Sequence, residues 1–270
     1  MEIVKVLYVT QEICPYLPES EIADLCRKLP QAIQEQGKEI RTFMPRFGCI
    51  NERRNQLHEV IRLSGMNLII DDTDHQLIIK VASIQAARMQ VYFIDNEDYF
   101  QRKTTLCDEN GEEYPDNDDR SIFFTRGVIE TVKKLRWTPD IIHCHGWMTA
   151  LMPLYIKKAY NEDPFFANSK VIYSLYDNDY KVPFDSDFSE KVLIEGIKKN
   201  DLTSIANDGS FNSLSKLAID FSDGIIQGSE KTNTELIEYA KKSKKMFLPY
   251  QTPENYVNSY DKFYDEILGL

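Results

Sequence analysis

The chain has 270 residues, of which 42% are hydrophobic and 28% charged, enough for one large α/β domain or two small ones with a sizeable core. Its 43 acidic and 32 basic side chains give a net charge of −11, which disfavours binding to nucleic acid or to anionic membranes. No apolar run reaches about 18 residues, so the sequence predicts no membrane-spanning helix.

The start of the chain and its cysteines indicate the compartment. The first apolar strand begins at Ile3 with no basic and apolar leader before it, so we expect a cytoplasmic location. The 5 cysteines are scattered and lack C-x-x-C spacing. This pattern is typical of free thiols and argues against a disulfide framework or a zinc knuckle.

The first part of the chain predicts two parallel strands followed by hairpins. A β-branched run, an amphipathic helix, a second strand and a set of short alternating segments follow one another at 3–9, 22–36, 39–44 and 60–94. The helix is expected to end at Gly37 and the second strand at Pro45. The alternating segments predict an antiparallel insertion that rejoins the main sheet.

The middle of the chain predicts a βαβ unit. An acidic, turn-rich segment at 96–119 predicts a mobile loop. It is followed by a helix at 120–135, a short apolar strand at 140–143, and a sharp turn that leads into a second helix. In open α/β sheets ligands bind where such strands end, so the turn with His145, Gly146 and Trp147 is the first candidate site.

The last part of the chain predicts further strands and helices of the same sheet. A strand, a long polar connection, a helix and a short strand are expected at 169–175, 176–209, 211–221 and 224–227. Ser229 is expected to cap a helix that ends near Lys242. An amphipathic helix at about 254–268 closes the chain. We find no repeat or linker, so residues 1–270 are expected to form a single domain.

Several of these segments, in this order, resemble one family. They read VLYVTQEICPYL, a helix with IADL and LPQAI, RTFMPRFG, VYFIDNEDYF, the DNDDR run with its FF, and TPDIIHCHGWMTALMPLYI. This sequence resembles the bacterial glycogen synthases and plant starch synthases, retaining glycosyltransferases of family 5, from residue 6 to about 229. The resemblance implies the N-terminal half of a GT-B enzyme. This half is a Rossmann-like domain that holds the glucan acceptor, and the donor-binding second domain is absent from this sequence.

Periodicity and resemblance together predict the fold class. We expect an α/β fold with a mostly parallel Rossmann-like sheet, helices on both faces and a β-hairpin insertion.

The sequence departs from three active-site signatures that the resemblance carries. The family's K-T-G-G-L-A-D loop, whose lysine serves the sugar nucleotide, has Pro18 at the lysine position. The aspartate of H-D-W, which reaches towards the acceptor, is replaced by Gly146. The histidine of an H-N pair, which approaches the transferred glucose, is replaced by Tyr176, a poor proton carrier because its pKa lies near ~10. Each replacement removes a side chain that the transfer reaction of the family uses.

The loop at 18–24 has a second, structural interpretation. Glu19 and Glu21 stand where the family has other residues, and each would repel a diphosphate by roughly 1 kcal/mol per close pair in a water-like dielectric. The same segment suits a helix start, with Ser20 as the N-cap and Glu21 and Asp24 near the positive end of the helix. We therefore predict that this loop is a helix cap.

The remaining candidate residues each carry two interpretations. The resemblance implies that His145, Trp147, Asp177 and Asn178 bind substrate. His143 and His145 share a strand face and could chelate zinc, but no third ligand is evident, so we predict no metal. Trp147 is more typical of core packing than of sugar stacking. The tyrosines of the last helix are more typical of a packed face than of a glucan platform.

The functional hypothesis follows from these losses. We expect a glycogen/starch-synthase-like pseudoenzyme, equivalent to the acceptor-side half of an ADP- or UDP-glucose:α-1,4-glucan glucosyltransferase. It would be inactive alone, would use no cofactor, and would bind an α-1,4-glucan, a malto-oligosaccharide or a protein partner. The alternative is a subunit of a split glycogen synthase that becomes active with a separate donor-binding chain. A nucleotide-binding or purely protein-interaction domain is the third hypothesis.

Overall fold

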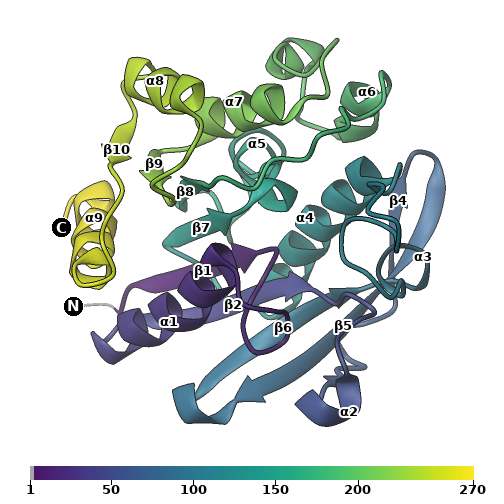
Figure 1. The fold of residues 1–270 in the computed structure, drawn as a ribbon, viewed down its shortest axis with the longest axis horizontal. Coiled ribbons are helices and arrows are strands. Elements are labelled where there is room, and N and C mark those ends of the chain that lie inside the picture. The colour runs from purple at the N-terminus through teal and green to yellow at the C-terminus, as the bar shows by residue number, and fades with distance from the viewer. Residues whose placement is uncertain (1–2) are drawn as a thin grey trace.

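The computed structural model describes residues 3–270 and contains one 10-stranded sheet (Figure 1). Its strands are β1 (Lys5–Thr10), β2 (Glu39–Pro45), β3 (His58–Glu59), β4 (Met66–Ile70), β5 (Thr73–Ile84), β6 (Met89–Asp95), β7 (Ile141–His145), β8 (Lys170–Leu175), β9 (Gly224–Gln227) and β10 (Met246–Leu248). They are ordered β10-β9-β8-β7-β1-β2-β6-β5-β3, with β4 paired to β5.

The helices are distributed over both faces of this sheet (Figure 1). They are α1 (Glu21–Glu35), α2 (Glu52–Asn55), α3 (Glu97–Phe100), α4 (Asn117–Lys134), α5 (Met152–Leu154), α6 (Phe188–Val192), α7 (Phe211–Phe221), α8 (Thr234–Lys242) and α9 (Tyr256–Leu268). Every strand pair from β10 to β6 is parallel, whereas β5 pairs antiparallel with β6, β3 and β4. The predicted α/β fold with a mostly parallel sheet and a hairpin insertion is therefore confirmed.

Alternating side chains of the central strands build two separate cores. Leu7 and Val9 of β1 point into the larger core, together with side chains of α4 and α7. Val6 and Tyr8 point the other way, towards α1 and α9. This alternation is the normal consequence of strand geometry, in which successive side chains leave opposite faces of the sheet. The edge where β1, β7 and β8 end is therefore flanked by helices on both sides.

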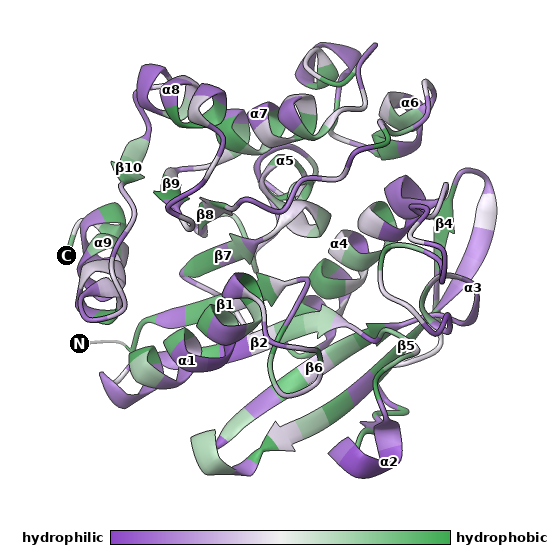
Figure 2. Ribbon diagram, viewed as in Figure 1, coloured by the Kyte–Doolittle hydropathy of each residue, from purple (hydrophilic) through white to green (hydrophobic). Residues whose placement is uncertain are grey.

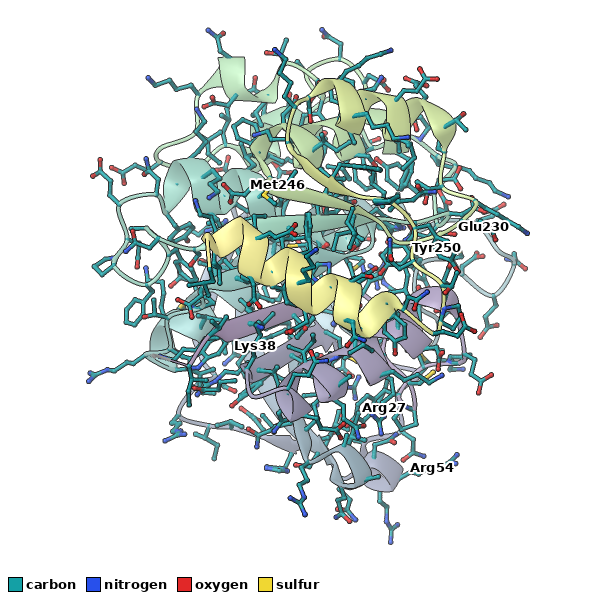
Figure 3. The ribbon with its side chains drawn as sticks, turned by 90° about the vertical axis from the view of Figure 1, so that its left-hand side faces the viewer. Arg27, Lys38, Arg54, Glu230, Met246 and Tyr250 are labelled. Carbon is teal, nitrogen blue, oxygen red and sulfur yellow. The ribbon has the colours of Figure 1, made fainter. Side chains whose placement is uncertain are left out.

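Helix α9 covers the part of this sheet face that α1 leaves open. Its buried side chains are Tyr260, Phe263, Tyr264 and Ile267, which pack on apolar side chains of β1, β7, β8 and β9. Lys38 Nζ lies 2.6 Å from Asp261 Oδ1 and 2.9 Å from Asp265 Oδ1, which holds the exposed side of the helix. Figure 2 shows that α9 carries both hydrophobic and hydrophilic residues, and Figure 3 shows the helix lying across the front of the sheet above Lys38.

One predicted helix start is wrong. The helix expected after Ser229 begins at Thr234, and its N-cap is Asn233, whose side chain accepts from the Glu235 amide at 2.9 Å. The reason lies in Thr232. Its hydroxyl donates to the carbonyls of Ser229 and of Leu175, at 2.8 and 3.1 Å, and so ties this segment to the end of β8. The chain can turn into a helix only after this contact.

The helix expected after the turn at 144–147 is broken into short pieces. A 3₁₀ turn at Trp147–Thr149 leads into α5, which continues as a π-helical turn at Tyr155–Ala159. Pro153 lies in the first turn of α5 and donates no backbone hydrogen bond. Among the residues that the structure describes, every helix is too short or too polar to cross a bilayer.

Candidate functional site

The candidate site lies at the carboxyl edge of the central strands. The register pairs Thr10 of β1 with His145 of β7, and His145 with Ser174 of β8, so these three strands end side by side. The residues that follow them in the chain therefore meet at one edge of the sheet. Because backbone groups at the carboxyl ends of parallel strands face outward there, this edge is where open α/β sheets bind ligands.

Gly146, where the resemblance implies an aspartate, is packed against Gln11. Its φ is +86°, and a Cβ built on it would lie 2.4 Å from Gln11 Oε1. Gln11 is itself buried, and its Oε1 accepts from the Met148 amide at 3.4 Å while its Nε2 donates to Glu12 at 2.9 Å. The glutamine side chain therefore occupies the space that a side chain at position 146 would need.

Tyr176, where the resemblance implies a histidine, points into the protein. It is 2% exposed, and its hydroxyl lies 2.7 Å from His145 Nδ1. The backbone of Gly228 packs closely against the tyrosine ring, and a Cβ at Gly228 would be 2.6 Å from Tyr176 Cε1. Burial raises the pKa of Tyr176 well above its ordinary value, so the phenol stays protonated. In this position Tyr176 is a packing residue of the edge.

His143 and His145 lie on one strand face, as the alternation predicts, with ring centroids 3.9 Å apart. Both nitrogens of His143 are engaged: Nδ1 lies 2.7 Å from the Tyr264 hydroxyl, and Nε2 lies 2.7 Å from Ser174 Oγ. In residues 3–270 no group of three or more His, Cys, Asp and Glu side chains is placed to hold a metal ion. His143 therefore links the sheet to α9, whereas His145 is bonded to Tyr176, which follows β8.

Burial of these two histidines makes stability depend on pH. Burial lowers the pKa of His145 to about 3 and that of His143 well below its ordinary value. Below a pH of about 6.5 each histidine binds a proton in the unfolded chain but stays neutral in the folded chain. The free energy of unfolding therefore falls as the pH falls, with a slope that approaches about 1.4 kcal/mol per pH unit for each histidine. Asp119 has the opposite effect on stability. Burial raises its pKa to about 6, so the folded chain binds this proton at a higher pH than the unfolded chain, and the free energy of unfolding rises as the pH falls.

A comparison of variants isolates the histidine contribution. In His145→Asn the slope of unfolding free energy against pH, measured by urea denaturation between about pH 6.5 and 5, is expected to be shallower by about 1 kcal/mol per pH unit than in the wild type. The Asp119 contribution is the same in both proteins. Parallel slopes in the two proteins would show that His145 is protonated in the folded state.

The loop at 18–24 forms the predicted helix cap. Ser20 is the N-cap of α1, and its Oγ accepts from the Ala23 amide at 3.0 Å. The Ser20 hydroxyl also donates to Glu12 Oε2 at 2.5 Å. Pro18 and Glu19 line a cavity of about 210 Å³ that ends at Phe47 and Leu106 on the far side. Two carboxylates and no lysine or arginine line this cavity, so it does not suit a diphosphate.

The remaining residues that the resemblance implies for substrate binding are divided between core and surface. Trp147 is 2% exposed and packs edge-on against Tyr180 and Phe184, with centroid distances of 5.1 and 5.7 Å. Asp177 is exposed, and Asn178 is half-buried with a buried Nδ2 that has no hydrogen-bond partner in the described part of the chain. Of the four, Asp177 and Asn178 are therefore the residues that solvent reaches.

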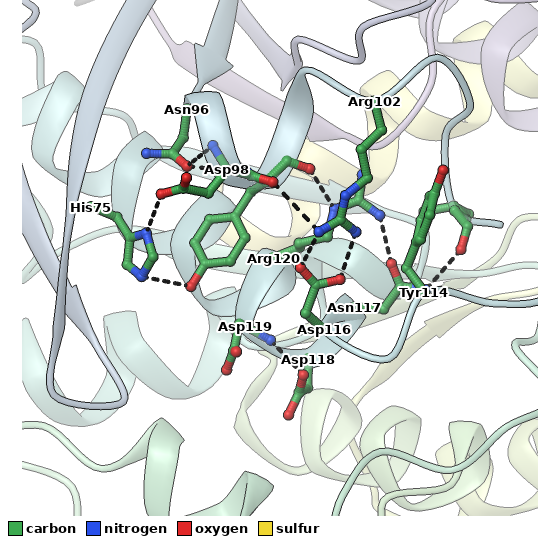
Figure 4. A network of polar contacts seen from close by, with 12 residues as sticks. His75, Asn96, Asp98, Arg102, Tyr114, Asp116, Asn117, Asp118, Asp119 and Arg120 are labelled. Atoms are coloured by element: carbon green, nitrogen blue, oxygen red, sulfur yellow. Dashed lines mark hydrogen bonds and ion pairs between the residues drawn. The ribbon is translucent and has the colours of Figure 1, made fainter. Parts of the chain in front are cut away.

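The acidic segment before α4 is anchored by arginines (Figure 4). Arg120 is fully buried and donates to the carbonyls of Tyr99 and Thr105 and to Asn117 Oδ1, at 2.8, 2.7 and 2.6 Å. Arg102 binds Asp116 with both guanidinium nitrogens. These contacts hold the segment as the outer wall of the cavity beside Pro18.

Gln11 is the site residue that sequence reasoning missed. It follows β1 directly, just as Gly146 follows β7, and the two strands are parallel neighbours in register. Two residues that follow paired parallel strands at the same level lie close together. The register itself is seen only in the structure, so no local pattern in the sequence pointed to Gln11.

The strand order, the helices on both faces and the hollow at the carboxyl edge define a Rossmann-like α/β protein. The model of the starch synthase catalytic domain family matches residues 5–246. The chain belongs to this family.

Curated relatives and a solved structure agree with this assignment. The chain is 40% identical over 173 residues to the glycogen synthase of Chlorobium limicola, and 39% identical over 197 residues to that of Chlorobium luteolum. These matches cover 64% and 72% of this chain but only 35% and 40% of the relatives. The chain thus matches little more than a third of their length.

The fold is similar to that of a plant enzyme. The catalytic domain of starch synthase IV from Arabidopsis thaliana, solved with ADP and acarbose, superposes with a TM-score of 0.73 over 93% of this chain and 52% of that chain, at 17% identity. At this identity the likeness shows the GT-B-type fold alone.

Proposed function

We propose that the chain is the acceptor-side half of an ADP- or UDP-glucose:α-1,4-glucan glucosyltransferase that does not transfer glucose by itself. It acts as a glucan-binding or partner-binding module in glycogen metabolism. Family membership supports the link to glucan metabolism. The loss of activity is supported by the three replaced positions, Pro18, Gly146 and Tyr176.

The observation that carries this proposal is the contact between Gly146 and Gln11. A missing carboxylate alone leaves an empty space that water or a substrate group can fill. Here the space is taken by a buried side chain with its own hydrogen bonds, and the glycine conformation is one that aspartate adopts with strain. At position 146 a packing contact occupies the place of a reactive side chain. The same holds at position 176, where the tyrosine packs against Gly228.

Preorganised groups that stabilise developing charge make the greatest contribution to catalysis in many enzymes, and the loss of each such group lowers the rate by orders of magnitude. The net loss at the carboxyl edge is a lysine, an aspartate and a histidine. Among residues 3–270, the charged groups at this edge do not take over their roles, because Glu12 and Glu19 carry the wrong sign for donor phosphates. Independent catalysis is therefore not expected.

The alternative is a subunit of a split glycogen synthase. It rests on family membership over residues 5–246, with the donor-binding site supplied by a separate chain. Under this alternative, purification of the chain from its native cells recovers a second chain with a donor-binding Rossmann domain, and the pair transfers glucose. Repeated recovery of the chain without such a partner would remove the support for this alternative.

A cosedimentation experiment tests glucan binding. The purified chain is expected to sediment with glycogen and to be released by soluble malto-oligosaccharides, while insoluble cellulose leaves it in solution. If the chain stays in the supernatant with glycogen at every concentration tested, the glucan-binding function is wrong and a protein partner remains as the function of the module.

A further inference from the structure

A second hollow lies on the other side of α1, away from Pro18. We call it the tyrosine pocket and define it by Tyr250, Tyr256 and Tyr260, which face Glu21, Asp24 and Gly228. Its volume is about 260 Å³, close to the lower end, about 300 Å³, of small-molecule pockets. Figure 3 shows Tyr250 on the loop that descends into the start of α9. The pocket therefore lies between this loop and the first half of α1.

The walls of the tyrosine pocket combine aromatic faces with hydrogen-bonding groups. Tyr256 and Tyr260 are perpendicular, with ring centroids 6.2 Å apart, and Tyr260 is buried while Tyr256 and Tyr250 are half-buried. Aromatic rings that are partly covered offer a flat apolar surface with a polar tip. A pyranose ring presents the complementary surface, an apolar C–H face surrounded by hydroxyl groups.

The charges around the pocket select against anions. Glu21 forms no ion pair among the described residues, and its carboxylate oxygens accept hydrogen bonds only. Lys28, the cation that lines the pocket, lies 2.7 Å from Asp24 Oδ2 and is already paired. A phosphate group would meet net repulsion, whereas neutral hydroxyl groups can donate to both carboxylates. The ligand class that fits is an uncharged, hydroxyl-rich ring.

The floor of the pocket is rigid. Gly228 follows β9, and its backbone rests on the ring of Tyr176, which is hydrogen-bonded to His145. Tyr260 belongs to the buried face of α9. A pocket with a fixed floor loses little conformational entropy when a ligand binds, which favours weak sugar ligands.

The aromatic half of the pocket lies outside the family match. The match ends at residue 246, whereas the tyrosines come from positions 250, 256 and 260. The pocket is therefore built by the C-terminal segment of this chain against α1.

We propose that the tyrosine pocket binds one end of a malto-oligosaccharide, with a glucose ring stacked on Tyr250 or Tyr256 and its hydroxyls donating to Glu21 and Asp24. This inference rests on the proposed function and places its glucan site outside the cavity beside Pro18. The pocket has room for about one sugar ring, so neighbouring rings of a glucan extend into solvent along α1.

The experiment is a titration of the full chain with maltotriose and maltoheptaose, followed by calorimetry and by NMR. Millimolar dissociation constants are expected, and the shifted NMR signals should cluster at 21–28 and 250–260. Of Tyr250→Ala and Tyr256→Ala, the variant that removes the stacking ring should weaken binding by about tenfold. Tyr239→Ala is the matched control, because Tyr239 is also half-buried but lies on α8, bonded to Asp220.

The outcomes separate the pocket from the proposed function. Equal binding by wild type, Tyr250→Ala and Tyr256→Ala would overturn the pocket and leave glucan binding standing elsewhere on the chain. Absence of binding by the wild-type chain to either sugar would overturn both. Thermal unfolding of each variant shows whether it is folded. If Tyr256→Ala disturbs α9, Glu21→Gln tests the same pocket from α1 and should weaken binding while lowering stability by no more than about 1 kcal/mol, the loss of one charge in the first helical turn.

Discussion

Replacing Gly146 by aspartate is expected to destabilise the chain by about 3 kcal/mol and to restore no activity. The new Cβ would lie 2.4 Å from Gln11 Oε1, and a φ of +86° is strained for any residue with a side chain. Overpacking and backbone strain each contribute about 1–2 kcal/mol. The measurement is the free energy of unfolding in urea, with the wild type in parallel.

A double-mutant cycle separates the two causes. Gln11→Ala in the Gly146→Asp background removes the overlap and is expected to recover the part of the loss due to overpacking, while the part due to φ remains. If Gly146→Asp is as stable as the wild type, Gln11 moves freely and the edge is open to a family-type carboxylate. The proposal that the Gln11 contact occupies the place of the family's carboxylate would then be wrong.

Replacing Arg120 by alanine is expected to destabilise the chain by about 4 kcal/mol. The guanidinium is fully buried and satisfies the carbonyls of Tyr99 and Thr105 and the amide oxygen of Asn117. Burial lowers the pKa of Arg120 to about 10, so it is still charged at neutral pH. Its removal leaves two buried acceptors and one half-buried acceptor without this partner, and chemical denaturation measures the loss.

The matched control for Arg120 is Arg53, an exposed arginine on α2 that makes no side-chain hydrogen bond among the described residues. Arg53→Ala is expected to change stability by no more than about 0.5 kcal/mol. Equal effects of the two substitutions would mean that water replaces the Arg120 contacts, and that the segment before α4 is held by the Arg102–Asp116 pair alone.

Local patterns predicted most of the fold. The helix cap at Ser20 and the helix at Phe211–Phe221 were predictable because a capping side chain and an apolar period are properties of a few neighbouring residues. The start of α8 was not, because the hydrogen bond from Thr232 to Leu175 joins residues 57 positions apart. Such a contact leaves no periodic signal in the sequence.

The same limit applies to the site. The residues at 18, 146 and 176 predict which family groups are missing, since that prediction needs only a motif in the sequence. What took their place depended on partners far away in the chain: Gln11 beside Gly146, and Tyr264 beside His143, 121 positions later. The tyrosine pocket likewise joins α1 to residues 250–260. Only three-dimensional packing brings these groups together.

The most direct test of the central claim is a glucosyltransferase assay on the purified chain. It is incubated with ADP-glucose or UDP-glucose and glycogen, and incorporation of labelled glucose into glycogen is measured beside a full-length glycogen synthase. No incorporation above the protein-free background is expected, either for the wild type or for the triple variant Pro18→Lys, Gly146→Asp and Tyr176→His. Sustained glucose transfer by the wild-type chain alone would contradict the account.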